Sequence, residues 1–143
     1  MGKKHKRQVL PTTPLANRII AQKPDCRQPI SFSFKYIDQS SGIFNLHGQT
    51  MRYIHIILEK LKMYSSLTIP EMTSNGSKAF RCHPIRWEET SQRGFPIKRE
   101  LYDGCAYQFS IMKSRGRIAG FIVGDIFYIV WIDPHHKLYP SKG

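Results

Sequence analysis

The C-terminal third of the chain carries the pattern of three neighbouring β-strands, and this pattern constrains the fold more than any other feature. Residues 107–111 alternate between apolar and polar side chains, residues 117–123 form a second strand-like segment, and residues 126–132 form a third that is apolar throughout. Turn residues separate the segments at 113–116 and at the Gly-Asp pair 124–125, which is typical of a two-residue hairpin. The sequence therefore predicts an antiparallel three-stranded meander whose last strand is buried on both faces.

A helix is predicted from residue 50 to about residue 64. Thr50 has a side chain suited to the N-cap position. Apolar residues at helical spacing predict one buried face, made of Ile54, Ile57, Leu58 and Leu61. His55 and Glu59 lie four residues apart on the opposite, polar face, so we expect them to pair at the surface.

Shorter elements complete the expected order. Residues 30–36 alternate with a period of two, which predicts a half-buried strand. Residues 68–71 form a capping-box pattern that predicts a short second helix, ended by the Asn-Gly pair 75–76. Residues 80–87 are expected to be extended, and Pro84 favours the edge of a sheet. This order predicts an α+β fold, with one or two helices packed on one face of an antiparallel sheet.

The chain is strongly basic, and the excess charge is spread over its whole length. Its 143 residues include 22 Lys and Arg against 10 Asp and Glu, a formal net charge of +12. Residues 1–28 have three prolines and a basic cluster, which predicts a basic arm, and residues 29–143 are expected to form a single domain. Arm and domain each carry six more basic than acidic residues. Solvated surface charge would explain this, but a basic domain also attracts polyanions, so we expect nucleic acid or the ribosome as a partner.

Several other classes of protein fit the sequence poorly. No apolar run approaches the roughly 18–20 residues of a membrane span, so no membrane partner is expected. The three cysteines, at positions 26, 82 and 105, do not suggest a disulfide framework, and a cytoplasmic location is the simplest expectation. The Cys-His pair 82–83 and the His-His pair 135–136 lack the spacing of a zinc site, so we expect no metal and no other cofactor.

Histidine and arginine side chains predict chemistry on RNA. An RNA strand is cut when a ribose 2′-hydroxyl attacks the adjacent phosphate. The reaction needs a proton acceptor, a proton donor and positive charge beside the phosphate. Imidazole suits both proton steps because its ordinary pKa lies near ~6.5, and the planar guanidinium group suits phosphate oxygens.

The segment 81–87 offers the first set of such groups. In an extended chain Arg81 and His83 share one face, and Arg86 adds a further charge. Trp87 either stacks on a base or packs in the core, and the sequence leaves this choice open. His83 is likewise compatible with a plain hydrogen-bonded position at a sheet edge.

The segment 133–139 offers the second set. Adjacent His135 and His136 cannot both face one pocket in a regular strand, and we favour His136 because Lys137 and Tyr139 follow it. The Asp-Pro pair 133–134 is a common opening of a turn, so Asp133 is interpreted as structural.

Two more arginines belong to the predicted meander. Arg117 begins its second strand, and Arg115 lies in the preceding turn. Together with Lys137, both are expected to bind the nucleic acid through its phosphates.

The meander and its tail resemble those of RelE/ParE-superfamily toxins. The resemblance rests on residues 107–111, 116–118 and 126–132, and on the basic and aromatic tail 135–139. It implies a RelE-like fold and a small endoribonuclease that cuts mRNA, often on the ribosome. It also implies an antitoxin partner, expected to be acidic, that holds the enzyme inactive.

These observations lead to one expected function and one alternative. The expected function is a RelE-like, metal-independent endoribonuclease. His136 and His83 would carry its protons, and Tyr139 would act as an accessory. The alternative is a non-catalytic nucleic-acid-binding or protein-interaction module of similar fold.

Overall fold

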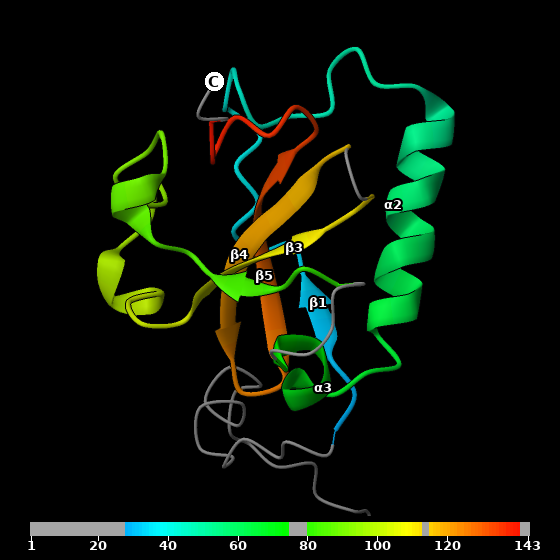
Figure 1. Ribbon diagram of the computed structural model, residues 1–143, viewed down its shortest axis with the longest axis vertical. Helices are drawn as coiled ribbons and strands as arrows, with labels where there is room; N and C mark the ends of the chain where they lie inside the picture. Colours follow the sequence, from blue (N-terminus) through cyan, green and yellow to red (C-terminus); the bar gives the residue numbers. More distant parts are fainter. Residues whose placement is uncertain (1–27, 75–79, 113–114, 141–143) are drawn as a thin grey trace, which may run out of the picture.

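The computed structural model describes residues 28–74, 80–112 and 115–140. The predicted arm lies outside this part of the chain except for Gln28, and so does the predicted helix end at 75–76. The fold is α+β, and the described residues form a five-stranded sheet and two α-helices (Figure 1). No helix in the described ranges is long and apolar enough to cross a membrane.

The predicted meander is confirmed and forms most of the sheet. Strand β3 pairs antiparallel with β4, and β4 pairs antiparallel with β5. Gly124 adopts φ 64° in the hairpin between β4 and β5, as a two-residue turn requires. The sheet order is β1-β5-β4-β3-β2. The strand bounds are β1 Ser31–Ser33, β2 His83–Pro84, β3 Ala106–Ser110, β4 Arg117–Val123 and β5 Ile126–Asp133.

The expectation of a wholly antiparallel sheet is wrong, because β1 runs parallel to β5. Strand β1 is also shorter than the alternating segment 30–36 from which it was predicted. The chain turns after β1, where the amide of Ile37 donates to the carbonyl of Phe34, and the regular pairing with β5 ends at Ser33. Parallel neighbours need a long connection, and here the other helices and strands of the described ranges lie between the two partners in the chain.

Helix α2 (Met51–Tyr64) confirms the predicted helix but not all of its buried face. The side chain of Thr50 accepts the amide of Tyr53 at 3.1 Å and so caps the first turn. The predicted surface pair of His55 and Glu59 is present at 3.1 Å. Leu58 is wrongly placed on the buried face, since its side chain is 59% exposed. The buried side chains of the helix are Tyr53, Ile57, Leu61 and Tyr64.

The two helices cover one face of the sheet, and loops cover the other. Helices α2 and α3 (Ile69–Thr73) pack with apolar side chains of β3, β4 and β5 in one core cluster. The predicted capping box at Thr68 and Glu71 is confirmed at the start of α3. A second cluster on the opposite face joins the sheet to the segment that contains the 3₁₀ turns η1 (Trp87–Glu89) and η2 (Arg99–Leu101). In Figure 1 this segment lies to the left of the sheet and α2 to the right.

A β-bulge in β5 decides which side chains reach the loop-covered face. Ala119 pairs with Trp131, whereas the next residue of β4 pairs with Ile129, so Val130 is an extra residue in β5. An extra residue reverses the alternation of the side chains that follow it. Val130 and Trp131 consequently lie in the same cluster. Asp133 therefore shares the loop-covered face of the sheet with Trp131.

Candidate active site

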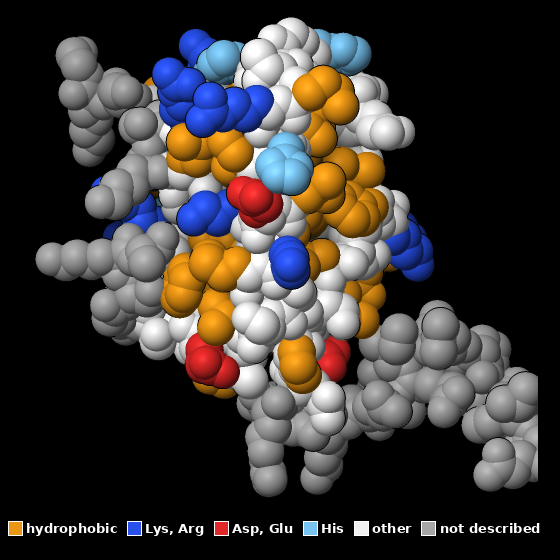
Figure 2. Space-filling view, turned by 90° about the vertical axis from the view of Figure 1, so that its right-hand side faces the viewer, with side chains coloured by type: hydrophobic (Ala, Val, Ile, Leu, Met, Phe, Trp, Pro, Cys, Tyr) orange, Lys and Arg blue, Asp and Glu red, His pale blue; other side chains and the backbone are white. Residues whose placement is uncertain are grey.

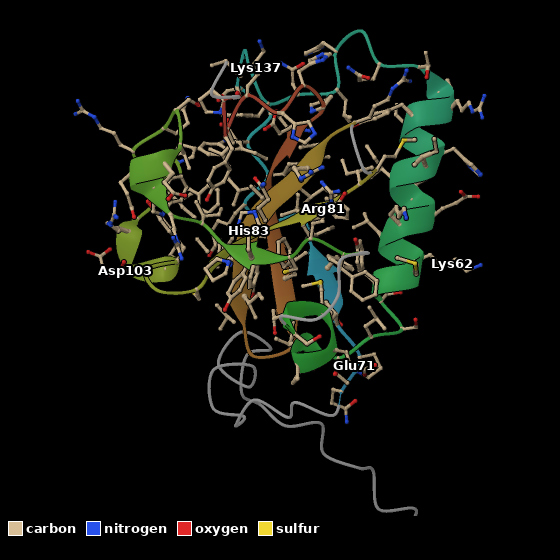
Figure 3. The ribbon with its side chains drawn as sticks, in the orientation of Figure 1. Lys62, Glu71, Arg81, His83, Asp103 and Lys137 are labelled. Atoms are coloured by element: carbon tan, nitrogen blue, oxygen red, sulfur yellow. The ribbon has the colours of Figure 1, made fainter. Side chains whose placement is uncertain are left out.

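A cavity of about 560 Å³ beside edge strand β2 brings together most of the residues predicted from the sequence. Figure 3 shows Arg81 and His83 beside one another in front of the sheet. Six predicted residues line the cavity: Arg81, His83, Arg86, Arg117, His136 and Tyr139. Pro84, Glu89 and Gln108 complete the lining.

Three predicted residues lie outside this cavity. Trp87 packs in the aromatic cluster of the loop-covered face, where its ring contacts those of Phe95, Tyr102 and Trp131. Packing therefore explains Trp87, and the interpretation as a base-stacking residue has no support from its position. The exposed side chain of Lys137 lies apart from Arg81 and His83 in Figure 3. Arg115 lines an adjacent hollow instead.

The adjacent hollow, of about 650 Å³, corrects the expectation for the two neighbouring histidines. Both His135 and His136 line it, and His136 also lines the cavity. Strand alternation does not apply to these two histidines, because β5 ends at Asp133 and His136 adopts φ 54°. The cavity and the hollow thus meet at His136.

Backbone strain is concentrated at the cavity. Within the described ranges, the non-glycine residues with positive φ are Arg81 (45°) and His136 (54°), and both line the cavity. The expectation that Arg81 lies in an extended strand is therefore wrong, although it reaches the same cavity as His83. Such conformations cost on the order of 1–2 kcal/mol per residue and gather at functional sites.

The hydrogen bonds of His83 leave one ring nitrogen, Nε2, as an acceptor. Its Nδ1 lies 2.9 Å from the carbonyl oxygen of Pro84, which can only accept, so Nδ1 carries the proton. In the neutral ring Nε2 then holds the lone pair, and it lies 3.4 Å from the side-chain nitrogen of Gln108. The ring of Tyr139 packs edge-on against the imidazole, with 5.4 Å between the two ring centroids. This geometry suits His83 to accept a proton at Nε2.

Gln108 is a site residue that the sequence analysis did not identify. It lies directly across from His83 in the pairing of β2 with β3, and its side chain is only 4% exposed. Its Oε1 is buried with no hydrogen-bond partner in the described structure, a situation that costs about 1–3 kcal/mol. The sequence feature that could have identified Gln108 is a long polar side chain within a predicted strand whose other face is apolar. If His83 gains a second proton at Nε2, rotation of the Gln108 amide can present this oxygen to it.

The imidazole of His136 is held by one hydrogen bond and lies close to two arginines. Its Nε2 accepts the backbone amide of Gly116 at 3.3 Å. Burial lowers the pKa of His136, and the positive charges of Arg117 and Arg81 lower it further, against an opposing effect of Asp133. A phosphate beside the two guanidinium groups would offset their charge and raise the pKa of His136 again.

Arg117 places a buried positive charge at the wall of the cavity. The residue is 7% exposed, and its Nη1 donates to three oxygens, those of Ser110 (Oγ), Met112 and Gly116 (both carbonyl). Burial lowers the pKa of Arg117, and the nearby charge of Arg81 lowers it further. None of the ion pairs found in the described ranges involves either arginine. An anion in the cavity would therefore stabilise both side chains.

Tyr139 is arranged as a hydrogen-bond donor. Its hydroxyl oxygen accepts the backbone amide of Arg86 at 2.8 Å, which leaves the phenolic proton free to point elsewhere. Burial raises the pKa of Tyr139, so the phenol keeps its proton at neutral pH. This fits a side chain that supports His83 and donates to a ligand, and does not fit one that ionises.

The surroundings of Cys82 do not suit a cysteine nucleophile. Burial raises the pKa of the Cys82 thiol to about 12, so it is not an activated nucleophile. Its side chain packs against the helix-covered core, away from His83. The described residues include no group of three or more His, Cys, Asp or Glu side chains placed to hold a metal ion.

Gly116 supports both His136 and Arg117, and its replacement is expected to damage the fold as well as the site. It adopts φ 106°, and a Cβ atom there would overlap the hydroxyl of Tyr53. We expect Gly116→Ala to lower the free energy of unfolding by roughly 2 kcal/mol or more, since overpacking alone costs about 1–3 kcal/mol. Urea denaturation measures this change.

Gly124→Ala is the matched control for that variant. Gly124 also has positive φ, but a Cβ atom there has nothing within 4 Å. Its cost should be limited to the backbone term of about 1 kcal/mol. Equal losses in the two variants would contradict the close packing of Gly116 against Tyr53.

Comparisons with known proteins assign no family to this site. No family model, no curated protein and no solved structure matches the chain. The function is therefore inferred from the residues of the cavity.

Proposed function

We propose that this protein is a metal-independent endoribonuclease of RelE-like fold that cuts mRNA, either free or bound to the ribosome. The cytoplasm, where mRNA is translated, is the corresponding location. An acidic antitoxin protein is the corresponding partner, because the chain carries a net charge of +12.

One observation carries the proposal, namely that two imidazoles and three guanidinium groups line a single cavity. The imidazoles are those of His83 and His136, and the arginines are Arg81, Arg86 and Arg117. Glu89 is the only carboxylate among the lining residues, and it lies 3.8 Å from Arg86. The other two arginines have no ion-pair partner in the described ranges, so the cavity favours an anion with proton-transfer groups beside it.

The proposed reaction is attack of the ribose 2′-oxygen on the adjacent phosphorus atom. His83 takes the 2′-hydroxyl proton at Nε2, the 2′-oxygen forms a bond to phosphorus, and the bond from phosphorus to the 5′-oxygen breaks. His136, charged once the phosphate is bound, releases the Gly116 amide, carries its second proton at Nε2 and gives that proton to the departing 5′-oxygen. The products are a 2′,3′-cyclic phosphate and a 5′-hydroxyl, and all atoms and protons are accounted for.

The remaining side chains have supporting roles in this reaction. Arg81 and Arg117 stabilise the charge that develops on the phosphate oxygens. Tyr139 donates to the same oxygens or holds the His83 ring in place. Gln108 accompanies His83 through both of its protonation states, with its amide nitrogen toward the neutral ring and its oxygen toward the charged ring.

The test is cleavage of RNA by the purified protein in the presence of EDTA, with and without ribosomes. We expect fragments that end in a 2′,3′-cyclic phosphate and begin with a 5′-hydroxyl, at a rate that EDTA does not change. Replacement of the ribose at the cleaved bond by deoxyribose should abolish cleavage there, because the nucleophile is gone. Fragments with a 5′-phosphate, or cleavage that requires a divalent cation, would contradict the mechanism.

A non-catalytic RNA-binding function is the second candidate, because the same unpaired arginines would hold phosphate without any chemistry. It predicts RNA binding that weakens steeply with salt. It also predicts no cleavage under any condition, including on ribosomes. The cleavage assay above therefore separates the two candidates.

A further inference from the structure

The hollow that adjoins the cavity at His136 has a composition that the proposed reaction does not use. It is lined at one side by the start of α2 and at the other by the turn between β3 and β4. Arg52 and Arg115 supply its charge, and no Asp or Glu is among its lining residues. Figure 2, seen from the α2 side, shows Lys and Arg side chains with a histidine beside them at the end of the molecule where α2 begins.

Both arginines of the hollow present free charges. The two side chains are exposed, and none of the ion pairs found in the described part of the chain involves them. The hydroxyl of Tyr53 donates to the backbone carbonyl of Arg115 at 3.1 Å, which ties the turn to α2. Burial raises the pKa of Tyr53 to about 12, so this donor persists at neutral pH. The position of Arg115 relative to Arg52 is thereby set by the fold.

Half-buried apolar side chains form part of the same hollow. Ile56 comes from α2, and Met112 follows β3. Apolar surface beside free arginines is the combination that single-stranded nucleic acid uses, since bases contact apolar groups while phosphates contact cations. A free phosphate or a mononucleotide would need only one of the two hollows.

We propose that this hollow binds the nucleotide next to the cleaved bond. The substrate is then a single strand that passes from the cavity, across His136, into the hollow. The inference rests on the proposed function, because it takes the cavity with His83 as the place of cleavage. Arg52 and Arg115 hold the flanking phosphate, and Ile56 and Met112 contact the flanking base. A dinucleotide then fills the cavity alone, whereas a tetranucleotide occupies both the cavity and the hollow.

The test measures binding of 2′-O-methyl oligonucleotides, which cannot be cleaved, in randomised pools of two, four and eight nucleotides. Fluorescence anisotropy should show that affinity rises about tenfold from two to four nucleotides, as one further base contact and one further phosphate contact suggest. The variant Arg52→Glu/Arg115→Glu should lose this rise while its dinucleotide affinity stays within about twofold of the wild type.

The matched control is Lys62→Glu/Lys98→Glu, which changes the net charge equally at two exposed positions outside both hollows. This control should keep the rise with length. A rise that survives in the Arg52 and Arg115 variant, or a wild type that binds all lengths equally, overturns the inference and leaves the cleavage proposal standing. A wild type that binds none of the oligonucleotides overturns both.

Discussion

His136→Ala is expected to reduce RNA cleavage by about 10²–10⁴-fold, the usual contribution of a positioned acid or base. His136 lines both the cavity and the adjacent hollow, and its ring accepts the backbone amide of Gly116. The ring is therefore held at the point where the proposed RNA strand would cross. The measurement is the single-turnover rate constant of cleavage, with the protein in excess of the RNA and at a concentration above the Kd. If expression of the parent protein arrests growth, cells that express the variant in its place should continue to grow.

Two further variants separate chemistry from folding. His136→Asn removes the imidazole but keeps a residue that tolerates the left-handed backbone found at this position, so it should be inactive and well folded. His55→Ala removes an exposed imidazole on α2 that pairs with Glu59 and lies outside the cavity, and it should leave cleavage unchanged. Cleavage at the parental rate by His136→Asn would exclude His136 as a proton carrier.

The pH dependence of stability offers a check that needs no RNA. Burial and then the charge of Arg117 lower the pKa of His136 in the folded protein below its ordinary value near 6.5. Between these two pKa values the unfolded chain binds more protons than the folded one, so the free energy of unfolding falls as the pH drops below about 6.5. We expect this decline to be smaller in His136→Asn, as measured by urea denaturation at pH 7.5 and pH 5.

Asp133→Asn is expected to destabilise the folded protein. The carboxylate of Asp133 is 1% exposed and accepts two backbone amides, those of Lys137 at 2.8 Å and Leu138 at 2.9 Å. The variant replaces one of these acceptors by an amide group that faces a donor. The loss should be roughly 1.5–3 kcal/mol, the contribution of a hydrogen bond to a charged group.

The same substitution should also disturb the site, because the two hydrogen bonds close the loop that contains His136. Removal of the negative charge also lowers the pKa of His136 further, since Asp133 opposes the effect of the arginines. Asp125→Asn, in the hairpin between β4 and β5, is the matched control and should cost little. If both variants melt at the parental temperature, the structural role assigned to Asp133 is wrong.

Local features of the sequence were enough to predict the elements that depend on neighbouring residues. Alternation and the Gly-Asp turn predicted the meander, and the Thr50 cap predicted helix α2, because a strand, a hairpin and a helix cap each involve residues only a few positions apart. The histidine and arginine residues were likewise visible as candidates, since their chemistry belongs to the side chain itself. Asp133 was correctly interpreted as structural from its place before a proline.

Tertiary structure decided which of those candidates meet. The parallel pairing of β1 with β5 joins segments about a hundred residues apart, and no local periodicity encodes it. The bulge at Val130 reverses the side-chain alternation before Asp133, and the left-handed backbone of Arg81 turns it into the cavity of His83. Gln108 became a site residue only when β2 paired with β3. Each of these contacts depends on distant parts of the chain packing together, which is why the sequence supplied the chemical groups and the fold determined their arrangement.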